Sequence, residues 1–213
     1  MLKVSELFTS IQGESTHVGR PCFFIRLAGC NLRCVYCDTV YACDQEGYDY
    51  SVDRLINFAG EQKIPLVEIT GGEPLLQSET PELCRRLLEN NFTVMIETNG
   101  TLDIGAVPAN CIRIVDVKCP DSGEKDSFLL TNLDKLNASD ELKFVLSSRE
   151  DFDWALHFVA HHKLQDICTI LFSPNLQRLV PSHLVSWILD CRAPVRLGLQ
   201  LHKYIWEPDT KGV

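Results

Sequence analysis

The chain has 213 residues, of which 45% are hydrophobic and 23% charged, values usual for a globular protein that buries its own core. Its formal net charge is -9 and it has no basic cluster, which argues against a general binder of nucleic acids or membrane surfaces. No apolar run is long enough to span a bilayer. The segment Met1–Glu6 lacks the apolar core of a signal peptide. We therefore expect one domain, residues 1–213, located in the cytoplasm.

Short and almost continuously apolar segments recur along the chain, and they predict strands with both faces covered. These segments are Cys22–Leu27, Leu66–Thr70, Phe92–Glu97, Ile112–Val117, Leu142–Leu146, Cys168–Phe172 and Val195–Leu201. Helices are expected between them, beginning after Ser51, at Thr80-Pro81, after Ser148 (in a capping box with Asp151) and at Pro181, with a short one at Leu129–Leu136.

Alternating strands and helices predict an α/β fold with parallel strands and right-handed crossovers. The units are too few for an eight-stranded barrel, so a partial (β/α) barrel or an open doubly wound sheet remains. In both folds ligands bind at the carboxyl ends of the strands. The polar motifs follow strands, at Cys30–Cys37, Thr70–Pro74, Glu97–Thr101, Asp116–Lys118 and Ser173–Asn175. We therefore expect them to meet at one edge of the sheet.

Ten cysteines are many for such a chain, and in a cytosolic protein they favour metal binding or catalysis over disulfides. Most stand singly in apolar runs and are expected to pack as small hydrophobic residues. These are Cys22, Cys84, Cys111, Cys168 and Cys191, whereas Cys43 and Cys119 are undecided.

Cys30, Cys34 and Cys37 stand within eight residues, so their thiolates can converge on one soft metal centre. A structural zinc site would normally want a fourth ligand, which Cys43 or His17 can supply. An iron–sulfur cluster of the cubane type on three cysteines would instead leave one iron free to bind a small molecule, unlike the four-cysteine clusters of electron carriers.

Two segments together resemble the radical S-adenosylmethionine (SAM) superfamily. The first is the Cys-x-x-x-Cys-x-x-Cys run Cys30–Cys37, with an aromatic residue before its last cysteine, and the second is Thr70-Gly71-Gly72-Glu73-Pro74 after the next strand. Further segments spread over nearly the whole chain are similar to the 7-carboxy-7-deazaguanine synthase family. They are Phe8–Glu14, Phe23–Leu32, Cys37–Thr39, Glu97–Thr101, Asp116–Pro120 and Gln200–Trp206.

The resemblance implies a partial (β/α) barrel of the radical SAM type with about six core parallel strands. It implies a lyase that converts 6-carboxy-5,6,7,8-tetrahydropterin into 7-carboxy-7-deazaguanine with release of ammonia, on the route to queuosine and other 7-deazapurines. A [4Fe-4S] cluster, SAM and Mg²⁺ are the implied cofactors. A flavodoxin- or ferredoxin-like electron donor and a homodimer are also implied. In this family the reduced cluster splits SAM, and the resulting 5′-deoxyadenosyl radical takes hydrogen from substrate C6 before the ring contracts.

Matching positions imply a role for each motif residue. The cluster would be bound by Cys30, Cys34 and Cys37, and Mg²⁺ by Thr39. SAM would contact Tyr36, Cys37, Asp38, Gly72, Asp116, Val117, Lys118, Ser173, Pro174, Asn175 and Leu176, and the substrate would contact Ile11, Gln12, Gly13, Arg26 and Thr70. Two purely structural alternatives stay open. Thr39 can simply end the cluster loop, and Ser173–Leu176 can simply be a loop that leads into a helix.

Arg26 lies in an apolar strand, where an unpaired guanidinium is costly. A substrate carboxylate is a fitting bidentate partner, and a structural ion pair with Glu14 or Glu68 is the alternative. Gln12 and Glu14 can recognise the donors and acceptors of a pterin edge, or can belong to an exposed turn around Gly13.

The residues leave some roles and two other functions open. Glu73 and Glu97 can contact ligand atoms or only stabilise loops, and His202 has no assigned role. An activase that makes a glycyl radical on another protein would have the same cysteine spacing, and a zinc-binding module would need no catalysis. The Gln12-Gly13-Glu14 segment and the Gln200–Trp206 segment favour the synthase over the activase.

Overall fold

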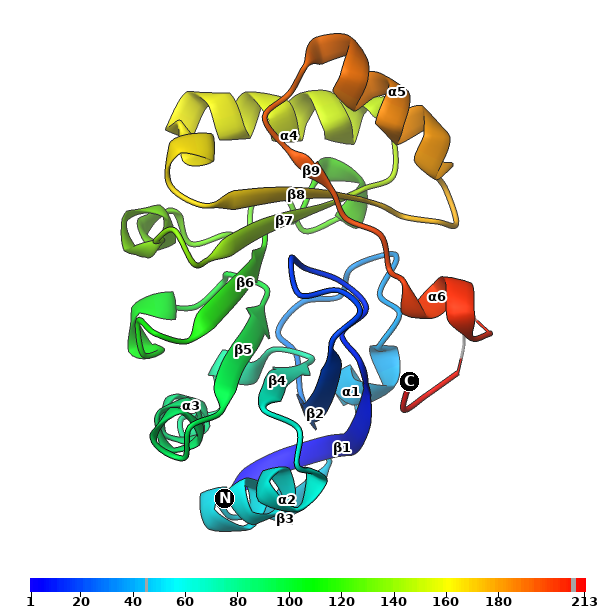
Figure 1. The fold of residues 1–213 in the computed structure, drawn as a ribbon. Helices are drawn as coiled ribbons and strands as arrows, with labels where there is room; N and C mark the ends of the chain where they lie inside the picture. The colour runs from blue at the N-terminus through cyan, green and yellow to red at the C-terminus, as the bar shows by residue number, and fades with distance from the viewer. Residues whose placement is uncertain (45, 208–209) are drawn as a thin grey trace.

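The computed structural model describes residues 1–44, 46–207 and 210–213 (Figure 1). Its strands are β1 (Leu2–Ile11), β2 (Pro21–Leu27), β3 (Tyr48–Tyr50), β4 (Leu66–Gly71), β5 (Thr93–Thr98), β6 (Ile112–Asp116), β7 (Glu141–Leu146), β8 (Thr169–Pro174) and β9 (Arg196–Leu197). They form one sheet in the order β3-β1-β2-β4-β5-β6-β7-β8-β9. From β2 to β9 all neighbours are parallel, whereas β1 is antiparallel to both β2 and β3.

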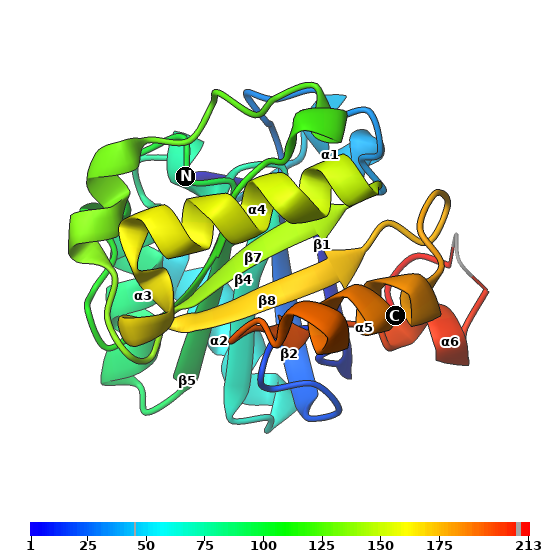
Figure 2. The same ribbon diagram turned by 90° about the horizontal axis from the view of Figure 1, so that it is seen from above.

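The sheet curves around an interior without closing, because β3 and β9 remain as its two edges (Figure 1). The helices are α1 (Val40–Asp44), α2 (Val52–Gln62), α3 (Thr80–Glu89), α4 (Arg149–His162), α5 (Pro181–Cys191) and α6 (His202–Ile205). The longer ones cover the outer face, and Figure 2 shows α4 and α5 lying along β7 and β8. The expected partial (β/α) barrel is confirmed.

All seven predicted strands are present, with two differences at the edges of the sheet. The last one is much shorter than the predicted Val195–Leu201, since β9 spans only Arg196–Leu197 and both residues are exposed. The antiparallel strands β1 and β3 were not predicted. The helix expected at Leu129–Leu136 is instead a 3₁₀ segment, Leu130–Lys135.

Two predicted helix starts are capped by serine side chains. Ser51 Oγ accepts a hydrogen bond from Arg54 N at 3.3 Å at the start of α2, and Ser148 Oγ accepts one from Asp151 N at 3.2 Å at the start of α4. The expected capping box at α4 is only half formed. The Asp151 carboxylate accepts from Ser147 N at 2.8 Å rather than from the backbone of Ser148.

Inward-facing residues change from apolar to polar along the strands. Since side chains alternate between the faces of a strand, every second residue points to the interior. Near the amino ends these residues form a small buried cluster of Cys22, Phe24, Leu66, Met95 and Ile114. Toward the carboxyl ends the corresponding positions hold Arg26, Thr70, Glu97, Asp116 and Lys143. The apolar tier is thus the floor of a polar site.

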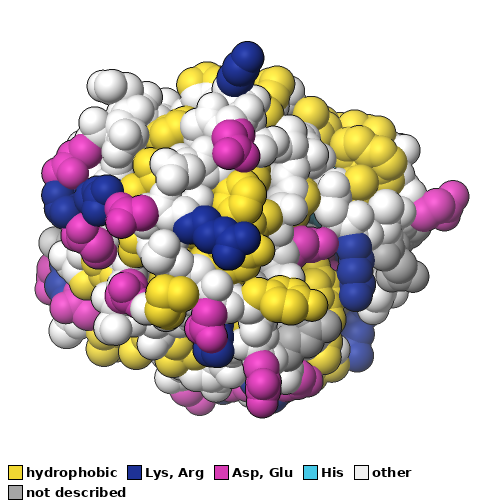
Figure 3. Space-filling view, turned by 90° about the horizontal axis from the view of Figure 1, so that it is seen from below, with side chains coloured by type: hydrophobic (Ala, Val, Ile, Leu, Met, Phe, Trp, Pro, Cys, Tyr) yellow, Lys and Arg dark blue, Asp and Glu magenta, His cyan; other side chains and the backbone are white. Residues whose placement is uncertain are grey.

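On the face of the molecule seen from below, basic and acidic side chains are interspersed, and no large patch of one charge sign is present (Figure 3). Within the described part of the chain, no helix is long and apolar enough to cross a membrane.

Candidate active site

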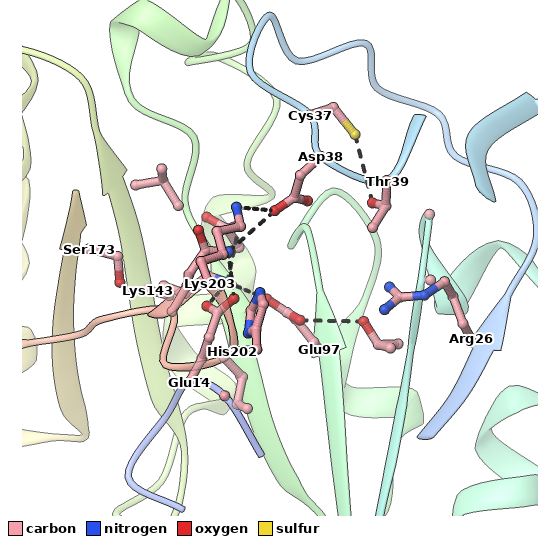
Figure 4. Close-up of a pocket in the computed structure, with 18 of the residues that line it drawn as sticks. Glu14, Arg26, Cys37, Asp38, Thr39, Glu97, Lys143, Ser173, His202 and Lys203 are labelled. Atoms are coloured by element: carbon pink, nitrogen blue, oxygen red, sulfur yellow. Dashed lines mark hydrogen bonds and ion pairs between the residues drawn. The ribbon is translucent and has the colours of Figure 1, made fainter. Parts of the chain in front are cut away.

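A cavity of about 710 Å³ lies at the carboxyl ends of the parallel strands (Figure 4). Residues expected to bind the cluster, SAM, Mg²⁺ and the substrate line this one cavity, with a single exception. The exception is Val117, whose side chain is fully buried in the core and whose N–H donates to Lys143 O at 2.8 Å. The motifs that follow different strands therefore do meet, as the parallel topology predicted.

The three motif cysteines are free, half-buried thiols on the cavity wall. Their loop is held at its start, where Gly29 N donates to Ala42 O at 2.8 Å. Cys30 Sγ is close to two donors, the N–H of Leu32 at 3.4 Å and Asn99 Nδ2 at 3.9 Å. Soft sulfur ligands with N–H groups directed at one of them fit an iron–sulfur cluster. Cys43 lines the same cavity, and its Sγ lies 3.7 Å from the carbonyl oxygen of Thr39.

Glu73 braces the loops beneath the cysteines and has no oxygen left for a ligand. It is fully buried. Its Oε1 accepts from Leu75 N at 2.9 Å and from Thr98 Oγ1 at 2.8 Å, and its Oε2 accepts from Asn99 N at 2.6 Å. Burial raises the pKa of Glu73, although these hydrogen bonds counteract the rise. Of the two roles left open by the sequence, loop stabilisation is the one these bonds support.

Lys143 is the centre of a buried ionic network that sequence reasoning missed. Its Nζ lies 2.9 Å from Glu14 Oε2, contacts Glu97 Oε1, and is 4.0 Å from Asp116 Oδ2. Figure 4 shows Lys143, Glu14 and Lys203 gathered in one part of the cavity. Burial disfavours the ammonium, but the three carboxylates outweigh it and raise the pKa of Lys143 well above its ordinary value. Burial likewise opposes ionisation of Glu14, yet Lys143 dominates and the pKa of Glu14 is lowered.

Asp116 and Lys118 form a second pair at the end of β6. Lys118 Nζ lies 2.6 Å from Asp116 Oδ2, and both side chains are nearly buried. The other oxygen, Asp116 Oδ1, is buried without a hydrogen-bond partner among the described residues. An orphaned carboxylate oxygen on a cavity wall fits a cationic or N–H donor of a bound ligand, such as the amino group of SAM.

Arg26 pairs with Glu6 rather than with Glu14 or Glu68, the alternatives expected from the sequence. Its Nε donates to Glu6 Oε2 at 3.2 Å, and its guanidinium lies 5.6 Å from the centre of the Phe8 ring. The two terminal nitrogens have no hydrogen-bond partner in the described part of the chain. The guanidinium points into the cavity (Figure 4). This arrangement combines a structural ion pair with a fork, formed by the two terminal guanidinium nitrogens, that is free to bind a ligand carboxylate.

Thr39 directly follows the cluster loop and lines the cavity. Its carbonyl accepts from Ala42 N at 2.9 Å at the start of α1, whereas its hydroxyl is only loosely placed, 3.8 Å from Cys37 Sγ (Figure 4). The backbone carbonyl of Thr39 therefore stabilises the loop, and the hydroxyl oxygen remains available to a hard cation.

The C-terminal segment crosses over the cavity and contacts both of its sides. Gln200 Nε2 donates to Glu14 Oε1 at 2.9 Å and to Asp38 Oδ2 at 3.3 Å, and Lys203 Nζ lies 2.8 Å from Asp38 Oδ2. Burial raises the pKa of Asp38, but Lys203 and Gln200 outweigh it and lower that pKa to about 2. The His202 ring packs on Gly13, where a Cβ would overlap its Nδ1. Burial lowers the pKa of His202.

The remaining SAM candidates line the wall formed by β7 and β8. Tyr36 OH donates to the carbonyl oxygen of Val145 at 3.5 Å. Ser173 and Pro174 end β8, and Asn175 is held by its N–H, which donates to Leu146 O at 2.8 Å. Leu176 follows on the same wall and is partly exposed.

Sequence reasoning missed Lys143 and Asn99 and left Gln200 and Lys203 without individual roles. For Lys143 a signal was present, since a lysine in the apolar run Leu142–Leu146 is costly unless charges surround it. For Gln200 and Lys203 no local signal exists, because their partners are Glu14 and Asp38, more than 160 residues earlier.

Comparisons with known proteins agree with this geometry. Residues 24–117 match the family model of the radical SAM superfamily. The chain is 43% identical to a 7-carboxy-7-deazaguanine synthase of Koribacter versatilis, with all of both chains covered, and 43% identical to one of Chlorobaculum tepidum, covering 100% of this chain and 97% of that one. A crystal structure of QueE from Escherichia coli superimposes with a TM-score of 0.77 at 25% identity, covering 93% of both chains. The chain therefore belongs to the 7-carboxy-7-deazaguanine synthase family of the radical SAM superfamily.

Proposed function

We propose that the protein catalyses the SAM-dependent ring contraction of 6-carboxy-5,6,7,8-tetrahydropterin to 7-carboxy-7-deazaguanine, with release of ammonia. The observation that carries this proposal is that one cavity is lined by groups of two different chemistries. The three cysteine thiols line it together with Arg26 and the polar groups around Gln12. Relatives that carry the synthase name match over the full length of the chain, which supports the same activity here.

A [4Fe-4S] cluster with SAM would supply a 5′-deoxyadenosyl radical when bound at Cys30, Cys34 and Cys37. The chain's own residues would hold SAM beside these cysteines. Lys118 pairs with Asp116 Oδ2, which leaves Asp116 Oδ1 to accept from the SAM amino group. The absent side chain at Gly72 lets the loop after β4 lie directly on the cysteine loop.

The substrate is oriented by groups of opposite character. The free fork of Arg26 binds the substrate carboxylate, since planar guanidinium and carboxylate groups match in geometry. At the other end, Lys143 keeps Glu14 ionised, and a carboxylate accepts from the N–H groups of a pterin. Gln200 and Lys203 close the cavity over these groups and limit the access of water.

Mg²⁺ is proposed to bind at Thr39, beside the carboxylate held by Arg26. One hydroxyl ligand can suffice, because Mg²⁺ keeps several waters and takes further oxygens from the substrate. We also infer that residues 1–213 act as one domain in the cytoplasm, as a homodimer, with a flavodoxin- or ferredoxin-like protein as electron donor. The single domain and the location rest on the length and composition of the chain, and the homodimer and the electron donor rest on the family resemblance.

The decisive experiment is anaerobic reconstitution. A brown protein with about four irons per chain is expected, and after chemical reduction it should convert the carboxytetrahydropterin into a product with the mass of 7-carboxy-7-deazaguanine. The Cys34→Ala variant should lose both iron and turnover, whereas Cys84→Ala should keep both, because Cys84 lies in the core away from the cavity. Iron binding and SAM cleavage without this product would leave the superfamily intact and contradict the proposed reaction.

A further inference from the structure

Glu68 is a buried carboxyl group that the activity described so far does not use. It lies on β4 between Leu66 of the apolar floor and Thr70 of the polar tier, is only 3% exposed, and lines the cavity. Its Oε2 accepts a hydrogen bond from Gln12 Nε2. Its Oε1 has no partner among the described residues. The group is therefore an almost completely buried side chain with one oxygen left for a ligand.

Glu68 differs from the other acidic side chains that line the cavity, because no cation pairs with it among the described residues. Each of the others has a lysine nitrogen within 4.0 Å. Lys143 forms ion pairs with Glu14, Glu97 and Asp116, and Lys203 forms one with Asp38. The part of the chain that is described offers no such partner to Glu68, and Arg26, whose charge acts on Glu68, pairs through its Nε with Glu6. An ionised carboxylate buried in this way is strongly disfavoured.

The surrounding charges act in the same direction as burial. Burial, and then the negative charges of Glu97 and Glu14, raise the pKa of Glu68 well above its ordinary value, and Lys143 and Arg26 only partly counteract them. Cys22, which faces Glu68 from β2, is itself a buried thiol and adds no positive charge.

The hydrogen bonds around Gln12 fix which oxygen of a neutral Glu68 carries the proton. Gln12 Oε1 accepts from Glu14 N, and Gln12 Nε2 donates to Glu68 Oε2. Glu68 Oε2 is therefore the acceptor, and the proton belongs on Oε1, where it is a free O–H donor at the cavity wall.

We propose that Glu68 is a neutral carboxylic acid that holds Gln12 in place and donates its O–H to an acceptor atom on the heterocycle of the substrate. This inference rests on the proposed function, because it takes the pterin as the ligand. A pterin edge presents both donors and acceptors. Glu14 and Glu97, which both pair with Lys143, suit its N–H groups, whereas an acid proton suits its carbonyl oxygen or an unprotonated ring nitrogen. The cavity thus uses two protonation states of one side-chain type to fix the orientation of the ring.

The first test is spectroscopic and needs no turnover. Infrared difference spectra of the cluster-loaded protein minus its Glu68→Gln variant, recorded near neutral pH, should show the C=O stretch of a protonated carboxylic acid. This band should shift when a tetrahydropterin is added. A matched control, Glu61→Gln on the exposed face of α2, should show only the carboxylate bands. Carboxylate bands alone for Glu68 would overturn the proposal.

The second test separates hydrogen bonding from charge. Glu68→Gln keeps an oxygen for Gln12 and places an N–H donor near the former O–H, so kcat/KM should stay within about threefold of the parent. Glu68→Leu removes both groups, and kcat/KM should fall roughly tenfold or more, mainly through KM. Iron content and SAM affinity should match the parent in both variants. Equal losses in the two variants would overturn the proposal. A parent protein that forms no deazaguanine product would contradict the proposed function instead, whatever the infrared band shows.

Discussion

Gly72 and Cys30 approach each other so closely that no other residue fits at position 72. A Cβ on Gly72 would lie 2.8 Å from Cys30 Cβ and would overlap the carbonyl oxygen of Gly29. The family resemblance implied a contact between this glycine and SAM, and the structure adds that the missing side chain makes room for the cysteine loop itself.

The Gly72→Ala variant should therefore displace the cysteine loop. We expect a destabilisation of about 1–3 kcal/mol from overpacking, together with a loss of bound iron after reconstitution. Gly60→Ala is the matched control, because an added Cβ on that glycine of α2 meets no atom within 4 Å. It should raise stability by about 0.5–1 kcal/mol and leave iron content unchanged. Normal iron binding by Gly72→Ala would contradict the packing argument. Thermal melts and iron assays measure both effects.

Lys143 is expected to be as important for stability as for binding. The Lys143→Met variant leaves the half-buried Glu14 and Glu97 without their cation, which should cost about 3 kcal/mol in the free energy of unfolding. Denaturant titration of the protein measures this loss. Lys125→Met, at an exposed position, should change stability by less than about 0.5 kcal/mol. A Lys143→Met protein as stable as the parent would show that the network is not formed.

The parallel part of the sheet could be predicted from sequence because buried strands are apolar on both faces. The strand β1 could not, since it mixes Lys3, Ser5 and Glu6 with apolar residues and owes its place to pairing with β2 and β3. The same limit applies to the site. The motifs predicted which strand ends would meet. They did not predict that Arg26 on β2 would form an ion pair with Glu6 on the antiparallel strand β1. Such partners depend on register and on long-range folding, and no local pattern specifies them.

Thr39 provides a test of the proposed Mg²⁺ site. Thr39→Ser keeps an oxygen ligand and should retain stimulation of turnover by Mg²⁺, whereas Thr39→Ala should lose the stimulation. Both variants should keep the iron content of the parent, because the hydroxyl lies 3.8 Å from Cys37 Sγ and the loop is held through the Thr39 carbonyl. Titration of turnover with Mg²⁺ measures the effect. A response of Thr39→Ala equal to that of the parent would remove Thr39 from the metal site.

His202 should make docking of the C-terminal segment sensitive to pH. Burial lowers the pKa of His202 below its ordinary value of 6.5; Lys203 and Lys143 act in the same direction, while Glu14 and Asp38 oppose them. The unfolded chain thus takes up the proton first on acidification. The contribution of His202 to stability is complete above about pH 6.5 and is lost as the pH falls through the folded pKa. Between about pH 7.5 and about pH 5.5 the melting temperature of His202→Gln should fall less than that of the parent. An identical fall in both proteins would exclude this role.

Arg26 has a structural partner and a free fork, and two variants separate these functions. Arg26→Lys keeps the charge near Glu6 but loses the planar fork, so KM for the carboxytetrahydropterin should rise roughly tenfold or more. Glu6→Gln removes the structural ion pair and leaves the fork intact, so KM should change by less than about threefold, with most of its effect on the melting temperature. Cleavage of SAM without substrate should be similar in the parent and in Glu6→Gln. If Glu6→Gln raised KM as much as Arg26→Lys, the guanidinium would act through the ion pair, and the substrate carboxylate would have to bind elsewhere.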